Sequence, residues 1–102
     1  MTNPLLSGLA PVHPGAVLRE DVLPAIGKPR AEVARLLRVS RQQLYDILNE
    51  RKPVTAQMAL RLARMFGGTA DTWLRLQQNF DLATIGTAMA GELAAIPQLQ
   101  AA

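Results

Sequence analysis

The sequence predicts an all-helical protein, and three of its features indicate that class. Alanine and leucine dominate the hydrophobic residues, which make up 49% of the chain, while β-branched residues are sparse. In several separate stretches, apolar residues recur at the three- and four-residue spacing of an amphipathic helix. Prolines, glycines and small polar residues stand between these stretches, where helices begin and end. With 102 residues, the chain has room for one domain with a single modest core.

An irregular arm is expected at the start of the chain, because residues 1–13 combine two prolines and a glycine with no periodicity. Pro14 suits the first position of a helix, where its missing N–H is not needed. This helix is expected to cover residues 15–23 and to stop within about one residue of Pro24, because proline removes a hydrogen bond inside a helix. His13, the single histidine, is expected to make a local hydrogen bond rather than to bind a metal.

The centre of the chain has the pattern of a helix-turn-helix. Pro29 opens a first helix over residues 30–37, and a second helix is expected over residues 41–49. Ser40 is a good N-cap for the second helix, and Gln43 completes a capping box. The apolar residues expected to pack the two helices together are Val33, Ala34, Leu37, Val39, Leu44, Ile47 and Leu48.

Arg38 stands in the turn between these helices, at a position where glycine is usual. A left-handed backbone would cost an arginine about 1 kcal/mol there. Two explanations remain open from the sequence. Either the turn is rearranged, or the strain is tolerated because Arg38 contacts a phosphate.

The second helix presents the side chains that read base edges in a DNA major groove. Arginine pairs bidentately with guanine, and glutamine pairs in the same way with adenine. Gln43 has the alternative of serving only the capping box, and Tyr45 that of shielding the edge of the core. Arg51 and Lys52 have the alternative of being solvated surface charges. The predicted base contacts are Arg41, Gln42, Gln43 and Tyr45, and the predicted phosphate contacts are Arg38, Ser40, Asn49, Arg51, Lys52 and Thr55.

The charge distribution supports a nucleic-acid partner. The chain has 11 Lys and Arg residues against 8 Asp and Glu residues, which gives a net charge of only +3. Residues 30–52 contain six of the basic side chains, whereas residues 80–102 contain none. A basic centre beside a nearly uncharged end favours a nucleic-acid face next to a packing face.

Two further helices are expected after the helix-turn-helix. Thr55 caps a helix over residues 56–66, which the glycines at 67–68 end, and Thr69 then caps a fifth helix. The apolar stripe of the fourth helix is formed by Ala59, Leu62, Ala63 and Phe66, and that of the fifth by Trp73, Leu76, Phe80 and Ala83. A weaker stripe continues to Ile96, but its two glycines, Gly86 and Gly91, make its helicity doubtful.

The predicted organisation is therefore a five-helix domain with a C-terminal helical extension. Its parts are an arm over 1–13, a DNA-binding domain with a dimerising last helix over 14–83, and a partly helical extension and tail over 84–102. The surplus of apolar residues near the end predicts a dimer interface. Its candidate residues are Trp73, Leu76, Phe80, Ile85 and Met89, with the alternative that Trp73 and Phe80 belong to the intramolecular core.

The sequence lacks the residue patterns that several classes of function require. No carboxylate pair, nucleophile–base set or glycine-rich phosphate loop is present, so we expect no enzyme, no metal site and no cofactor. The chain has no cysteine, which fits a reducing cytoplasm. It also has no recognisable signal peptide and no apolar run of about 20 residues, so a membrane association is not expected.

Beyond the helix-turn-helix itself, the flanking segments are similar to a known family. They read H-P-G at 13–15, S-R-Q-Q-L-Y-D-I-L-N at 40–49 and T-W-L-R-L-Q-Q-N-F-D-L at 72–82. Over residues 12–97 the chain resembles the HigA-type antitoxins of bacterial toxin–antitoxin modules, within the lambda-repressor-like (Xre) helix-turn-helix group. Ala16 departs from the glutamate common after H-P-G, and Pro29 departs from a polar helix cap.

The resemblance implies a homodimeric cytoplasmic repressor that binds a palindrome in its own promoter. It also implies a partner, a small ribosome-dependent messenger-RNA endonuclease toxin that the antitoxin neutralises by forming a complex. The candidate toxin contacts are the N-terminal arm together with Arg19 and Glu20. Two alternatives remain, a stand-alone repressor without a toxin and a protein-interaction adaptor that does not bind DNA.

Overall fold

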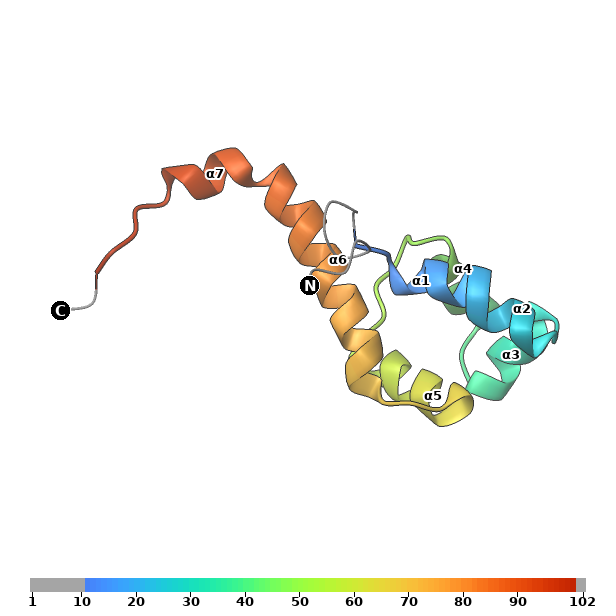
Figure 1. Ribbon diagram of the computed structural model, residues 1–102. Helices are drawn as coiled ribbons and strands as arrows, with labels where there is room; N and C mark the ends of the chain where they lie inside the picture. Colours follow the sequence, from blue (N-terminus) through green and yellow to red (C-terminus); the bar gives the residue numbers. More distant parts are fainter. Residues whose placement is uncertain (1–10, 101–102) are drawn as a thin grey trace, which may run out of the picture.

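The computed structural model describes residues 11–100, and all the regular secondary structure in this part of the chain is helical (Figure 1). Five helices form the domain, and a sixth extends it. The first is continuous and consists of α1 (Pro14–Val17), the wider π-type turn η1 (Leu18–Val22) and α2 (Leu23–Ile26). The others are α3 (Arg30–Leu37), α4 (Arg41–Leu48), α5 (Ala56–Phe66), α6 (Ala70–Ala88) and α7 (Ala90–Ala95). The predicted fold class is confirmed, while residues 1–10 of the expected arm lie outside the described residues.

The first helix does not stop at Pro24, so its predicted end is wrong. The chain stays helical to Ile26, and Gly27, with φ 75°, then ends the helix in a left-handed conformation. In η1 the N–H of Leu23 donates to the carbonyl oxygen of Leu18, five residues earlier. This wider turn places Pro24 in the first turn of α2, where a missing N–H costs little.

A single core lies between the five helices. It contains the predicted helix-turn-helix residues Val33, Ala34, Leu37, Leu44, Ile47 and Leu48, each at most 5% exposed. Val39 packs against this core from the turn and is only partly buried. The remaining core residues are Leu18, Leu23, Val54, Met58, Ala59, Leu62 and Trp73, which come from the first helix, the loop before α5, α5 and the start of α6.

Backbone-to-backbone contact between α1 and α4 brings the first helix directly onto the helix predicted to read DNA. Gly15 makes this approach possible, because a Cβ at this position would overlap the carbonyl oxygen of Ile47. It would also lie 2.8 Å from the carbonyl carbon of Ile47. The position of α4 therefore depends on a residue without a side chain at Gly15.

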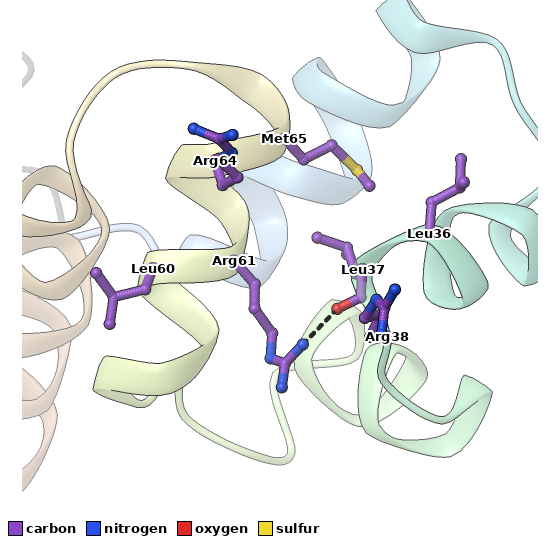
Figure 2. Close-up of a pocket in the computed structure, with 7 residues that line it drawn as sticks. All are labelled: Leu36, Leu37, Arg38, Leu60, Arg61, Arg64 and Met65. Atoms are coloured by element: carbon purple, nitrogen blue, oxygen red, sulfur yellow. Dashed lines mark hydrogen bonds between the residues drawn. The ribbon is translucent and has the colours of Figure 1, made fainter.

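Side chains that are distant in the sequence bind the ends of the helix-turn-helix and the loop after it, and no local signal in the sequence indicated these contacts. Arg19 donates to the carbonyl oxygen of Leu48 over 2.6 Å, which satisfies the C-terminus of α4, and it pairs with Glu50 at 3.3 Å. Side chains also bind a carbonyl oxygen at the end of α3 and an N–H group in the loop before α5. Arg61 donates to Leu37 over 2.8 Å (Figure 2), and Gln77 accepts from the N–H of Val54 over 2.8 Å.

Beyond Phe80, α6 continues as a helix through Gly86 to Ala88, and α7 follows after Met89. The doubt about helicity in this stretch is therefore resolved in favour of helix. The division expected between residues 83 and 84 falls inside α6. Figure 1 shows that the second half of α6 and α7 project away from the other helices. Among the helices of residues 11–100, none has the length and hydropathy needed to span a membrane.

His13 is the N-cap of α1, and its Nδ1 accepts the N–H of Gly15 over 2.9 Å. This confirms the predicted local hydrogen bond. The ring is buried and meets Phe80 edge-on, with ring centroids 4.9 Å apart. Burial lowers the pKa of His13 below its ordinary value of 6.5; Glu50 and Asp81 oppose this shift, and Arg19 adds to it.

The lowered pKa of His13 predicts that acid destabilises the fold. Below pH 6.5 the unfolded chain binds a proton at this position more readily than the folded chain does. The contribution of neutral His13 to the free energy of unfolding is therefore fully present above pH 6.5, and it is lost as the pH falls through the lowered pKa. Substituting His13→Asn keeps a capping acceptor without the titration. The Tm of the native protein should therefore fall more steeply below pH 6.5 than that of the variant. Parallel curves for the two proteins would contradict the prediction.

Candidate nucleic-acid interface

The tip of α4 is built by a complete capping box. The N–H of Gln43 donates to Ser40 Oγ over 3.0 Å, and Gln43 Oε1 accepts the N–H of Ser40 over 3.1 Å. This arrangement was predicted from the sequence and is confirmed. The apolar face of α4 is buried in the core, and this burial fixes the orientation of the helix. Arg41 and Gln42, at the start of α4, are exposed to solvent.

The structure shows how two residues with alternative predicted roles, Gln43 and Tyr45, are placed on this helix. Gln43 uses its carbonyl oxygen in the capping box, and Tyr45 is partly buried against the edge of the core. The structure thus shows both of the alternative roles considered for these residues. Both side chains still lie beside the exposed tip, and their contacts with bases remain predictions.

Asp46 links the tip of α4 to the loop that follows it, and sequence reasoning missed this residue. Its Oδ1 accepts from Gln42 Nε2 over 2.8 Å and pairs with Arg51 Nη2 at 3.3 Å. Its side chain is only 18% exposed. The spacing of Gln42 and Asp46, four residues apart on a helix, was the available signal for a pair on one face.

Predicted base and phosphate contacts come together between α4 and the start of α5. Gln43, Asp46, Lys52 and Thr55 line a hollow of about 230 Å³ there. Thr55 Oγ1 accepts the N–H of Met58 over 3.2 Å, which confirms that it caps α5. The first amide groups of α5 therefore lie next to the basic loop, an arrangement that suits a phosphate.

Arg38 does not line that hollow. Its backbone is left-handed, with φ 62° and ψ 42°, so the turn is not rearranged to avoid the strain. Its side chain is exposed and lines a groove of about 500 Å³ between α3 and α5 (Figure 2). Leu36, Leu60, Arg61 and Arg64 line the same groove. Glu50 is a second left-handed residue, with φ 61°, and nothing in the sequence analysis indicated it.

Substituting Arg38→Gly should stabilise the protein by up to about 1 kcal/mol, because glycine adopts the left-handed conformation without strain. Arg38→Ala is the matched control, since it removes the same charge and keeps the strain. Urea unfolding of the three proteins measures the difference. Equal stabilisation by both substitutions would show that the charge of Arg38, rather than its backbone, is unfavourable.

The predicted dimer residues differ in their burial. Trp73 is 8% exposed and belongs to the intramolecular core, so its assignment to a dimer interface is corrected. Leu76 and Phe80 are partly buried, and Leu76 packs against the core. Met89 is partly buried to a similar degree, and Ile85 alone of the five is exposed, at 53%. Further exposed apolar residues after Phe80, which were not among the predicted dimer residues, are Leu82, Leu93, Ile96 and Leu99.

Comparison with known proteins identifies the architecture. The helix-turn-helix family model HTH_3 matches residues 18–80. Virulence-associated protein I of Dichelobacter nodosus is 42% identical over 71 residues, which are 70% of this chain and 66% of that protein. The chain thus spans slightly less than two thirds of the length of this curated relative.

Solved structures agree with the whole described fold. The antitoxin GraA superposes with a TM-score of 0.84 at 39% identity, covering 90% of this chain and 100% of that one. GraA in complex with its operator superposes with a TM-score of 0.83 at 37% identity, covering 99% of each chain. The Pseudomonas aeruginosa antitoxin HigA, solved with the higBA promoter, gives a TM-score of 0.82 at 36% identity over 88% of this chain and 99% of that one. The chain therefore belongs to the helix-turn-helix family HTH_3 and, within it, to the HigA-type antitoxins.

Proposed function

We propose that this protein is a DNA-binding antitoxin that represses its own promoter and neutralises a cognate toxin. The observation that carries the DNA-binding part is the tip of α4, where the capping box and the buried apolar face hold Arg41 and Gln42 outward. Two relatives of this fold, GraA and HigA, were solved with an operator and a promoter. In this proposal Arg41 pairs with guanine and Gln42 with adenine, while Lys52 and Thr55 contact phosphates.

A homodimer is part of the proposal. The second half of α6 and α7 carry exposed apolar side chains, of which Leu82 and Leu93 are 67% and 47% exposed, and Ile96 follows directly after α7. Their association would bring two recognition helices to sites about 34 Å apart, one turn of DNA, and match a palindrome. Light scattering at micromolar concentration tests this proposal. A monomer mass would contradict it, and Leu82→Glu should shift a dimer toward the monomer.

Binding to the DNA upstream of the gene is the direct test of repression. We expect saturable binding to a palindrome within that DNA, at least about a thousandfold tighter than to random duplex at the same salt concentration. Affinity for both should fall as salt rises, because phosphate contacts release counterions. Binding without any sequence preference would contradict the repressor function and favour the adaptor alternative.

Toxin neutralisation is tested by co-expression with the product of the adjacent reading frame. The proposal expects a growth defect from that product alone, rescue by this chain, and co-purification of the two. Arg19 was a candidate toxin contact, but its guanidinium is engaged by Leu48 and Glu50. Specific DNA binding without any toxic or bound partner would identify a stand-alone repressor instead.

A further inference from the structure

Asp46 occupies an unusual position on the surface proposed to read DNA. It is an acidic residue one turn after Gln42 on α4, and its oxygen Oδ1 receives both the amino group of Gln42 and the guanidinium of Arg51. Its main-chain carbonyl oxygen also accepts the N–H groups of Arg51 and Lys52, over 2.8 and 3.2 Å. The carboxylate is thereby held between the tip of the recognition helix and the loop behind it.

The chemistry of these partners determines how the amide of Gln42 is turned. The two ends of a glutamine amide have nearly the same shape, but one donates hydrogen bonds and the other accepts them. A carboxylate only accepts, so the amino group of Gln42 must face Asp46. Rotating the amide by 180° would place its carbonyl oxygen against the carboxylate, which is repulsive. Asp46 therefore allows one orientation of Gln42.

This orientation has a consequence for the base that Gln42 recognises. With one amino hydrogen bound to Asp46, the carbonyl oxygen and one remaining hydrogen of Gln42 are free. Adenine offers one donor and one acceptor in the major groove, which match this pair, whereas guanine offers two acceptors. A free amide could turn both amino hydrogens toward guanine. An amide tied to a carboxylate has only one hydrogen left to donate.

We propose that Asp46 is a positioning residue for base recognition. It orients the amide of Gln42 so that Gln42 prefers adenine over guanine at one base pair. Arg51 assists by holding the carboxylate in place through their ion pair. The proposal rests on the DNA-binding function proposed above and adds the residue that sets specificity at this base pair. Asp46 acts through Gln42 and makes no base contact of its own.

The test is selection of binding sites from a randomised duplex library, followed by sequencing. The proteins compared are the native chain, Asp46→Asn, Gln42→Ala and the double variant. Asp21→Asn is the matched control, because it makes the same charge change at an exposed residue of η1. Thermal unfolding verifies that each variant is folded.

The native protein and Asp21→Asn should prefer adenine over guanine at one base pair by about tenfold or more. In Asp46→Asn the asparagine both donates and accepts, so Gln42 is free to turn, and this preference should fall at least about fivefold. The affinity for random duplex should stay equal or rise, because a negative charge has left a surface that faces phosphates. In the Gln42→Ala background, adding Asp46→Asn should change no base preference.

Two results would overturn the proposal while leaving the repressor function intact. In the first, Asp46→Asn selects the same motif with the same preferences as the native protein. In the second, Asp46→Asn changes a base preference equally with and without Gln42, which would mean that Asp46 reads a base itself. If the native protein selects no motif at all, the DNA-binding function and this inference fail together.

Discussion

Replacing Gly15 by alanine is expected to destabilise the protein by about 3 kcal/mol and to lower its Tm by about 15 °C. The added methyl group would overlap the carbonyl oxygen of Ile47 and press on the backbone of α4. A flexible side chain can rotate out of such a contact, but a carbonyl inside a helix cannot. Either α1 or α4 must therefore shift, at the expense of the core between them. Urea and thermal unfolding followed by circular dichroism measure the effect.

Gly86→Ala is the matched control, because the same methyl group meets nothing within 4 Å at this position of α6. Alanine is a better helix former than glycine, so this substitution should stabilise the protein by about 0.5–1 kcal/mol. The opposite signs of the two effects separate steric contact from glycine flexibility. If Gly15→Ala has the same Tm as the native protein, the backbones of α1 and α4 are not in close contact at this position.

The features that could be predicted from the sequence are those that local signals determine. Ser40, Thr55 and Thr69 each cap the helix that follows, as expected, because an N-cap bonds to an amide only two or three residues away. The helix-turn-helix core followed from the spacing of its apolar residues for the same reason. Pro24 shows where a local rule fails, since a single π-type turn accommodates the proline inside the helix.

The contacts that could not be predicted from the sequence join residues that are distant in the chain. Arg19 and Gln77 look like ordinary surface residues, yet they bind the backbone of Leu48 and Val54, 29 and 23 residues away. Gly15 has no local turn to explain it, because its partner is the backbone of α4. The candidate site differs, because the residue missed there has local partners. Arg41 and Gln42 were identified from their position on the helix, whereas Asp46 was missed although it lies four residues after Gln42 on the same face.

Arg41→Ala and Lys52→Ala are expected to weaken DNA binding in different ways. Arg41 lies at the exposed tip of α4, where it pairs with a guanine in the proposed complex. Its loss should cost about 1–3 kcal/mol on the preferred duplex and relax the preference at one base pair. Lys52 lies in the loop beside the start of α5, where the proposed partner is a phosphate. Its loss should weaken binding to all sequences and reduce the slope of log K against log salt by about 1.

A double-mutant cycle that combines a protein substitution with a base substitution separates these two roles from a general loss of positive charge. Changing the guanine read by Arg41 should weaken the native protein and Lys52→Ala alike, but should cost Arg41→Ala almost nothing further. Arg75→Ala removes the same charge from an exposed position on α6 and should leave both the base preference and most of the affinity unchanged. If Arg41→Ala and Lys52→Ala lose specific and random binding equally, the division between base reading and phosphate binding is wrong. α4 would then be held on the DNA by charge, and its specificity would have to come from the shape of the operator rather than from its base edges.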